Sequence, residues 1–210
     1  MHIVSVLINV TIAVLSVVAW LMLAGDVSDP QKLAARGWES LKYFTVLSNL
    51  FSAVASLVYV LHCLVVGGQI PLWLTILKLA AATAVMLTFL TVVLLLGPYF
   101  GYGKLFLGGN LWMHLVLPLL ALVDCWLFVP IGKTPLWMTA FALLPTLLYG
   151  AWYLARVLRH GAARDGVVYD FYGFTRWGKE KIPVVAAGML AFSWVIALLI
   201  RLGSKLFGVG

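Results

Sequence analysis

The sequence predicts an all-α, polytopic integral membrane protein, with a single domain (residues 1–210) folded as a bundle of six transmembrane helices. Of the 210 residues, 64% are hydrophobic and 10% are charged, and the mean hydropathy is +1.08. Soluble domains average about 45–50% apolar and about 25% charged residues, so this composition lies outside their range. The apolar residues gather in six long runs without the alternation of barrel strands. Because lipid admits only helices and closed barrels, these runs predict helices.

Each apolar run is long enough to cross about 30 Å of hydrocarbon at a rise of about 1.5 Å per residue. The first run lacks the basic segment that precedes a cleaved signal, so we expect a retained helix there. Pro118 and Pro145 lie inside runs and are expected to kink their helices. Four other prolines mark the ends of runs: Pro71, Pro98, Pro130 and Pro183. The predicted spans are residues 3–23, 41–66, 72–96, 111–129, 136–158 and 183–202.

The distribution of basic residues predicts the orientation in the membrane. Six spans place both termini on one side, and the loops at residues 25–40, 97–110 and 159–182 on the other. Those loops and the adjoining span ends hold ten of the fourteen Lys and Arg residues, so the positive-inside rule makes that side cytoplasmic. The net charge of +7 indicates attraction to anionic lipid headgroups. The sequence has no basic stripe on a soluble face, so it does not predict a nucleic-acid partner. The ten are Lys32, Arg36, Lys42, Lys104, Arg156, Arg159, Arg164, Arg176, Lys179 and Lys181.

The cysteines and histidines do not predict a metal site or a cofactor. Cys63 and Cys125 both fall near the outward ends of their spans, where a disulfide is geometrically possible, but we expect two buried thiols acting as small apolar residues. No Cys or His cluster has metal-ligand spacing. His62 and His114 fall at opposite faces of the membrane, which excludes them as axial ligands of one haem iron.

Two charged residues lie well inside predicted spans, where charge is costly. Lys78 lies about six residues after the third span enters the membrane from the outward side. Asp124 lies about six residues before the fourth span leaves the membrane on that side, so both residues are at a depth of about 9 Å. We expect them to pair as structural buried charges. The alternative for Lys78 is extension of its amine toward the outer headgroups.

Polar residues on the second span form a stripe at the opposite depth. Thr45, Asn49, Ser52 and Ser56 recur at i, i+4, i+7 and i+11, so they share one helix face that must point into the bundle. From spacing alone, such a stripe is typical of packing between membrane helices, where small and hydroxylated residues are common.

A histidine at matched depth suggests a second role for this layer. A hydroxyl becomes a nucleophile when a base removes its proton, and imidazole is suited to that task near neutral pH. Thr45 lies about four residues into the second span and His114 about three into the fourth, both from the same side. His62 lies about 25 Å along the helix from Thr45, too far to serve. Taken alone, a histidine at a helix start usually only forms hydrogen bonds.

Three segments resemble a known family. "GWESLKYFTVLSNL" (37–50), "WMHLVLPLLALVDCWLF" (112–128), and "PTLLYGAWYLARVLRHG" with "YDFYGF" (145–174) are similar to segments of the androgen-induced and androgen-dependent-TFPI-regulating membrane proteins and their bacterial integral membrane relatives. The resemblance covers most of the chain from the second span onward. The "VLSN" after the threonine follows the bacterial relatives, which implies a bacterial cytoplasmic membrane.

The family resemblance implies a membrane hydrolase that cleaves fatty acid esters of hydroxy fatty acids or similar lipid esters. It implies Thr45 in "KYFT" as the nucleophile and His114 in "MHLVLP" as the base, with Asp124 matching the family's later acidic residue. Asn49 and then Asn110 are the candidates to support the oxyanion, each one turn from a catalytic residue. Asp124 falls about 15 Å deeper than His114, so the imidazole must be oriented by another group, such as Asp170, a backbone carbonyl or water.

The expected partners are membrane lipids and the lipid ester substrate, and the sequence does not indicate an oligomeric state. A different class of function stays open, a non-catalytic lipid-binding or transport protein in which the polar layer holds a headgroup. Transport is less favoured, since inverted repeats and broken helices are absent from the sequence pattern.

Overall fold

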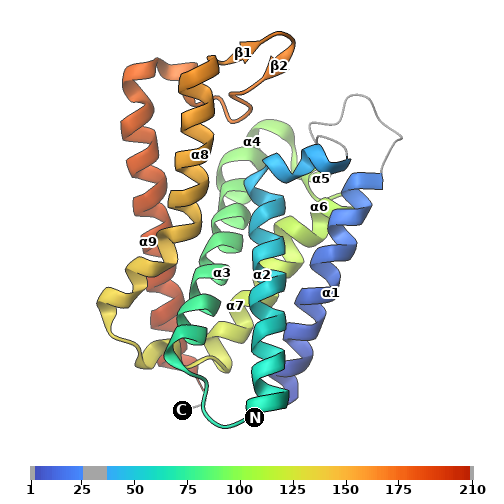
Figure 1. Ribbon diagram of the computed structural model, residues 1–210, viewed down its shortest axis with the longest axis vertical. Coiled ribbons are helices and arrows are strands. Elements are labelled where there is room, and N and C mark those ends of the chain that lie inside the picture. The colour runs from blue at the N-terminus through green and yellow to red at the C-terminus, as the bar shows by residue number, and fades with distance from the viewer. Residues whose placement is uncertain (1–2, 26–36, 209–210) are drawn as a thin grey trace.

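The structure is a computed structural model that describes residues 3–25 and 37–208 (Figure 1). Six of its helices are long and apolar enough to span a membrane, which confirms the predicted fold class. They cover Ile3–Gly25, Phe44–Val66, Leu72–Phe100, Gly109–Leu127, Leu136–His160 and Lys179–Phe207. Lys32 and Arg36, on the first predicted cytoplasmic loop, lie outside the described residues.

The spanning helices are assembled from shorter helical segments, with two-residue strands between the last two spans. The first half of the chain contains α1 (Ile3–Gly25), η1 (Gly37–Lys42), α2 (Phe44–Leu61), η2 (His62–Val66), α3 (Leu72–Thr91), η3 (Val92–Leu96), α4 (Gly97–Phe100) and α5 (Tyr102–Leu105). The second half contains α6 (Gly109–Leu111), η4 (Trp112–Val116), α7 (Leu117–Leu127), η5 (Pro130–Lys133), η6 (Leu136–Leu143), α8 (Leu144–His160), β1 (Ala163–Arg164), β2 (Val167–Val168), η7 (Phe174–Trp177), η8 (Lys179–Lys181) and α9 (Ile182–Phe207).

The largest differences from the predicted span ends occur in the third and sixth spans. The third continues through Pro98 to Phe100, because a proline in the first turn of α4 needs no N–H partner. The sixth continues past Leu202 to Phe207 and so adds Lys205 to the helix that already carries Arg201. The Arg201 guanidinium donates two hydrogen bonds to the Thr134 carbonyl, at 3.0 and 2.7 Å, so its N–H groups have a partner near the helix end.

Helix α3 forms the centre of the bundle. Every residue from Lys78 to Thr88 is buried, so this stretch is covered on all sides. Four alanines in the stretch, Ala80, Ala81, Ala82 and Ala84, allow neighbouring helices to approach closely. Helices α2, α7 and α9 pack against α3, with α1 on α2 and with α8 and α9 side by side at the opposite edge (Figure 1).

Both chain ends lie at one end of the bundle, as six spans require (Figure 1). We call the opposite end, which carries α4, α5 and the β1–β2 hairpin, the loop end. The two strands pair antiparallel, Ala163 with Val168 and Arg164 with Val167. Cys63 and Cys125 are free thiols; Cys125 is buried, as expected, whereas Cys63 is only half-buried.

Candidate functional site

Thr45 lies at the loop end, in the first turn of α2. Its side chain is half-buried. The N–H of the preceding residue, Phe44, donates to the Tyr172 hydroxyl at 2.9 Å, so a side chain from the 161–178 loop caps this helix terminus. The Tyr149 hydroxyl donates to the Lys42 carbonyl at 2.7 Å, which ties α8 to the segment just before α2. The backbone around Thr45 is therefore held from two other parts of the chain.

His114 lies at the centre of η4, a π-helical turn inside the fourth span. Pro118 follows four residues later, and its missing N–H cannot bond to the His114 carbonyl, which favours a wider turn at this point. The imidazole is buried, and its Nδ1 lies 2.8 Å from the Leu105 carbonyl oxygen. Because a carbonyl only accepts, Nδ1 carries the hydrogen and the lone pair of the neutral ring is on Nε2. A backbone carbonyl thus orients the histidine.

Asn49 joins the two segments that carry Thr45 and His114. Its Nδ2 donates to the Thr45 carbonyl at 2.8 Å and to the Met113 carbonyl at 3.2 Å. Both hydrogens of the Asn49 amide are used. The opposite orientation of the amide is unfavourable, because it would place Oδ1 against the same two carbonyl oxygens. Asn49 therefore has no N–H left for an oxyanion, contrary to the first-ranked role that its spacing suggested. Its fully buried Oδ1 has no partner among the described residues, which favours a donor such as water there.

Asn110 is the remaining amide near the histidine. It lies in α6, four residues before His114 in one continuous span, and is half-buried. Within residues 3–25 and 37–208 its side chain makes no hydrogen bond, so its two N–H groups are available. This makes Asn110 the better-placed oxyanion donor of the two candidates.

The structure brings Thr45 and His114 into one region without a direct bond between their side chains. In the described part of the chain, the Thr45 hydroxyl forms no hydrogen bond, and the one hydrogen bond of the imidazole goes to Leu105. The link between them runs through Asn49 and the backbone of Met113. One turn along α2 from Thr45, the Ser48 hydroxyl lies 3.3 Å from the Thr88 hydroxyl, which joins α2 to α3 at this level.

Asp170 has a structural role in the loop end rather than a contact with His114. Its carboxylate accepts hydrogen bonds from the Tyr153 hydroxyl, from the Phe174 and Thr175 N–H groups at 2.8 Å each, and from the Thr175 hydroxyl at 2.5 Å. Burial alone would raise the pKa of Asp170, but these hydrogen bonds outweigh it and hold the pKa below its ordinary value. Burial raises the pKa of Tyr172 in the same loop. The "YDFYGF" segment is thus folded around Asp170 so that Tyr172 reaches α2.

Lys78 and Asp124 form an ion pair on the far side of the membrane, as their matched depth predicts. Lys78 Nζ lies 3.0 Å from Asp124 Oδ2, and their side chains are 2% and 0% exposed. Asp124 also accepts hydrogen bonds from Ser5 at 2.6 Å and Asn9 at 2.8 Å, and Ser5 lies 2.9 Å from the Tyr59 hydroxyl. Four helices are connected by this network, α1, α2, α3 and α7. With its charges paired and hydrogen-bonded, it stabilises the bundle rather than presenting a reactive group.

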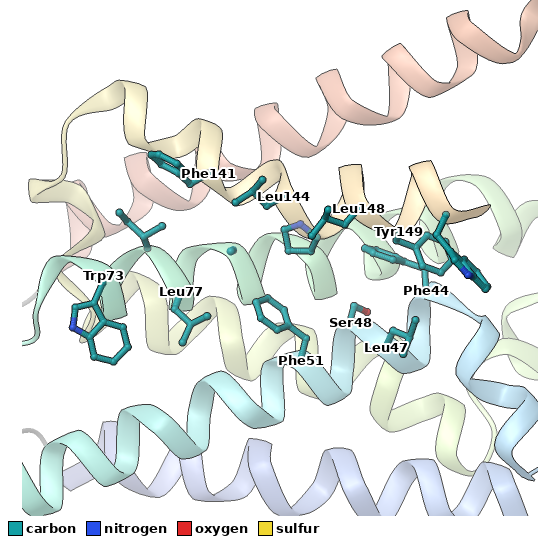
Figure 2. Close-up of a pocket in the computed structure, with 14 residues that line it drawn as sticks. Phe44, Leu47, Ser48, Phe51, Trp73, Leu77, Phe141, Leu144, Leu148 and Tyr149 are labelled. Atoms are coloured by element: carbon teal, nitrogen blue, oxygen red, sulfur yellow. The ribbon is translucent and has the colours of Figure 1, made fainter. Parts of the chain in front are cut away.

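A cavity of about 730 Å³, the lateral groove, lies between α2 and the fifth span, over α3. Figure 2 shows Phe44, Ser48 and Phe51 on one wall and Leu144, Leu148 and Tyr149 on the other, with Trp73 at the far end. Thr45 and His114 are not among its lining residues. The remaining lining residues are Leu47, Ile76, Leu77, Ala80, Phe141, Pro145 and Trp152.

A second cavity of about 440 Å³, the basic pocket, lies at the loop end. It contains Lys42, Arg156 and Glu39, and it shares Trp152 with the lateral groove. Its other lining residues are Trp38, Leu41, Tyr153, Val167, Val168, Tyr169 and Phe171.

Several features of this region have no strong signal in the sequence. The Leu105 carbonyl, which orients His114, is a backbone group in a loop. The capping role of Tyr172 requires the 161–178 loop to fold back onto α2. The clustering of aromatic residues in "YDFYGF" was a weak signal for such a docked loop.

Among the described residues, no group of three or more His, Cys, Asp or Glu side chains is arranged to hold a metal ion. In comparisons with known proteins, no family model, curated protein or solved structure matches this chain.

Proposed function

We propose that this protein is an intramembrane lipid ester hydrolase in which Thr45 is the nucleophile and His114 the general base. The observation that carries the proposal is the arrangement around Asn49, which bonds to the backbone of Thr45 and of Met113, next to a histidine whose Nδ1 is held by the Leu105 carbonyl. An imidazole fixed in this way presents the lone pair of Nε2 as a proton acceptor, as a general base requires. The resemblance of "KYFT" and "MHLVLP" to the threonine hydrolases supports the same residues.

The proposed reaction has two steps. The Thr45 hydroxyl attacks the ester carbonyl and His114 Nε2 takes its proton; collapse of the tetrahedral intermediate breaks the ester bond, and the imidazolium returns the proton to the leaving alcohol. Water then gives a proton to Nε2 and attacks the acyl-threonine. Collapse of this second tetrahedral intermediate breaks the bond between the acyl carbon and Thr45 Oγ, the imidazolium returns its proton to Oγ, and the fatty acid is released. Asn110 would stabilise the oxyanion in both steps, and Asn49 Oδ1 would hold a water molecule.

We also propose an orientation. The loop end would face the cytoplasm, because the loops at this end and the adjoining span ends together hold ten of the fourteen Lys and Arg residues. The substrates would be fatty acid esters of hydroxy fatty acids or related lipid esters that reach Thr45 laterally between the helices.

A turnover assay tests the hydrolase. The purified protein in a non-ionic detergent is given a palmitoyl ester of hydroxystearic acid, and the released fatty acid is measured. Thr45→Ala and His114→Gln should each abolish turnover. Thr75→Ala removes a threonine hydroxyl that bonds only within its own helix, to Pro71, and should leave the rate unchanged. Equal turnover in Thr45→Ala and in the unmodified protein would refute the proposal.

The second candidate function is non-catalytic lipid binding, and the lateral groove favours it. The groove is lined almost entirely by apolar side chains, and it lacks Thr45 and His114. Its volume of about 730 Å³ lies within the range of ligand sites, roughly 300–1,000 Å³. A lipid acyl chain held here would need no catalytic residue.

A further inference from the structure

The lateral groove extends across the membrane-spanning part of the bundle. Trp73 lies in the first turn of α3 and Phe44 in the first turn of α2, and these two helices begin at opposite ends of the bundle. Between them the groove is bounded by side chains that are exposed on the outer surface of the helices, including Leu144 and Leu148. An elongated, apolar, outward-facing groove fits an acyl chain of the surrounding lipid.

The groove adjoins the basic pocket at a single side chain, Trp152, which lines both. Arg156 lies one turn further along α8, with its guanidinium 5.1 Å from the centre of the Trp152 ring and 5.3 Å from that of Tyr169. A chain that leaves the groove past Trp152 therefore meets Arg156. Tryptophan is enriched at the boundary between hydrocarbon and headgroups, which places the basic pocket at headgroup level.

The basic pocket has cations available for an anion. Lys42 stands over the rings of Tyr43 and Phe171 at 5.6 and 5.7 Å. In the described residues neither Lys42 nor Arg156 forms an ion pair with a carboxylate, and Glu39 is the one acidic residue that lines the pocket. A guanidinium with free N–H groups is suited to bind a phosphate oxygen pair.

We propose that the lateral groove and the basic pocket together form a binding site for an anionic phospholipid, with an acyl chain in the groove and the phosphate at Lys42 and Arg156. This inference rests on the second proposed function, lipid binding in the groove, and adds the headgroup class. It does not require Thr45 or His114. The occupant is a lipid of the bilayer rather than a soluble phosphate, because the apolar groove and the basic pocket adjoin at Trp152, which lines both.

Native mass spectrometry of the intact protein in a non-ionic detergent tests this site. The probes are phosphatidylglycerol and phosphatidylcholine with identical acyl chains, each added separately, and glycerol phosphate as the headgroup without chains. We expect phosphatidylglycerol to bind about tenfold more tightly than phosphatidylcholine, because one additional charge-assisted hydrogen bond accounts for an affinity difference of about this size. Glycerol phosphate should not bind in the same concentration range.

Two double variants and one groove variant locate the site. Lys42→Gln with Arg156→Gln should remove the preference for phosphatidylglycerol while phosphatidylcholine binding is kept, which also shows that the variant is folded. Arg159→Gln with Lys181→Gln removes the same charge from residues that line neither cavity, and should keep the preference. Leu144→Trp, which fills the groove, should weaken both lipids.

Each contrary result has a separate meaning. Equal binding of the two lipids by the unmodified protein, or equal loss of preference in the two double variants, would overturn the headgroup inference and leave lipid binding in the groove intact. Binding of neither lipid would overturn both the inference and the lipid-binding function. Tight binding of glycerol phosphate would overturn the assignment to a bilayer lipid.

Discussion

Lys78 Nζ lies 3.0 Å from Asp124 Oδ2 in the interior of the bundle, and both side chains are almost completely buried. The cost of removing two charges from water is offset here by their attraction and by the hydrogen bonds from Ser5 and Asn9 to the carboxylate. The stability of the protein should therefore fall more when one partner of the pair is removed than when both are replaced by apolar residues.

Lys78→Met should lower the free energy of unfolding by about 3–5 kcal/mol, because it leaves the Asp124 carboxylate buried without its counter-ion. The double variant Lys78→Met with Asp124→Leu should lose less than Lys78→Met alone, since no uncompensated charge remains. Denaturant unfolding in mixed micelles, followed by tryptophan fluorescence, measures both. Additive losses in the double variant would show that the two residues do not act as a pair.

Asn110→Ala and Asn49→Ala should have different consequences. Asn110 has free N–H groups and is proposed to stabilise the oxyanion, so its loss should lower kcat by about 100-fold with little change in Tm. Asn49 uses its N–H groups to connect α2 and η4, so Asn49→Ala should lower Tm, with any fall in kcat accompanied by that loss of stability. Measurement of kcat and Tm on both variants separates these roles. A normal kcat in Asn110→Ala would exclude it as the oxyanion donor.

The fold of the 161–178 loop should depend on the ionisation of Asp170. Hydrogen bonds hold the pKa of this carboxyl below its ordinary value, so the unfolded loop has the higher pKa. The stabilisation is present above about pH 4 and is lost as the pH falls through the folded-state pKa, because protonation removes an acceptor. Hydrogen exchange at the Phe174 and Thr175 amides, corrected for intrinsic rates, should show high protection at pH 5 and a loss of protection as acidification protonates Asp170.

Two variants serve as controls for this dependence. In Asp170→Asn the amide N–H₂ faces donors, so the same amides should exchange rapidly at every pH. Asp165→Asn changes a carboxylate that is 88% exposed and that pairs, among the described residues, with Arg164 alone, and it should leave the protection unchanged. Full protection of the two amides in Asp170→Asn at pH 5 would show that Asp170 does not hold the loop.

Much of the fold follows from local features of the sequence. Apolar runs and their flanking prolines predict the six helices, since membrane thickness and backbone hydrogen bonding leave few alternatives. Helix rise places Lys78 and Asp124 at one depth and so predicts their pairing, which the packing of α3 against α7 makes possible.

The parts that the sequence did not predict depend on packing between distant segments. Ser5 and Asn9 join the Lys78–Asp124 network only because α1 packs beside α2 and α7. The use of both Asn49 N–H groups depends on the position of the Met113 carbonyl, which the π-helical turn at 112–116 alters. The lateral groove exists because α2 and α8 are separated over α3, which no local pattern indicates.

The identity of the nucleophile is the central claim, and covalent labelling tests it most directly. The purified protein is treated with a fluorophosphonate probe and digested, and the modified residue is located by mass spectrometry. The account predicts an adduct on Thr45, no adduct at this position in Thr45→Ala, much slower labelling in His114→Gln, and unchanged labelling in Thr75→Ala. Labelling of equal extent in Thr45→Ala, or an adduct on any other residue, would contradict it.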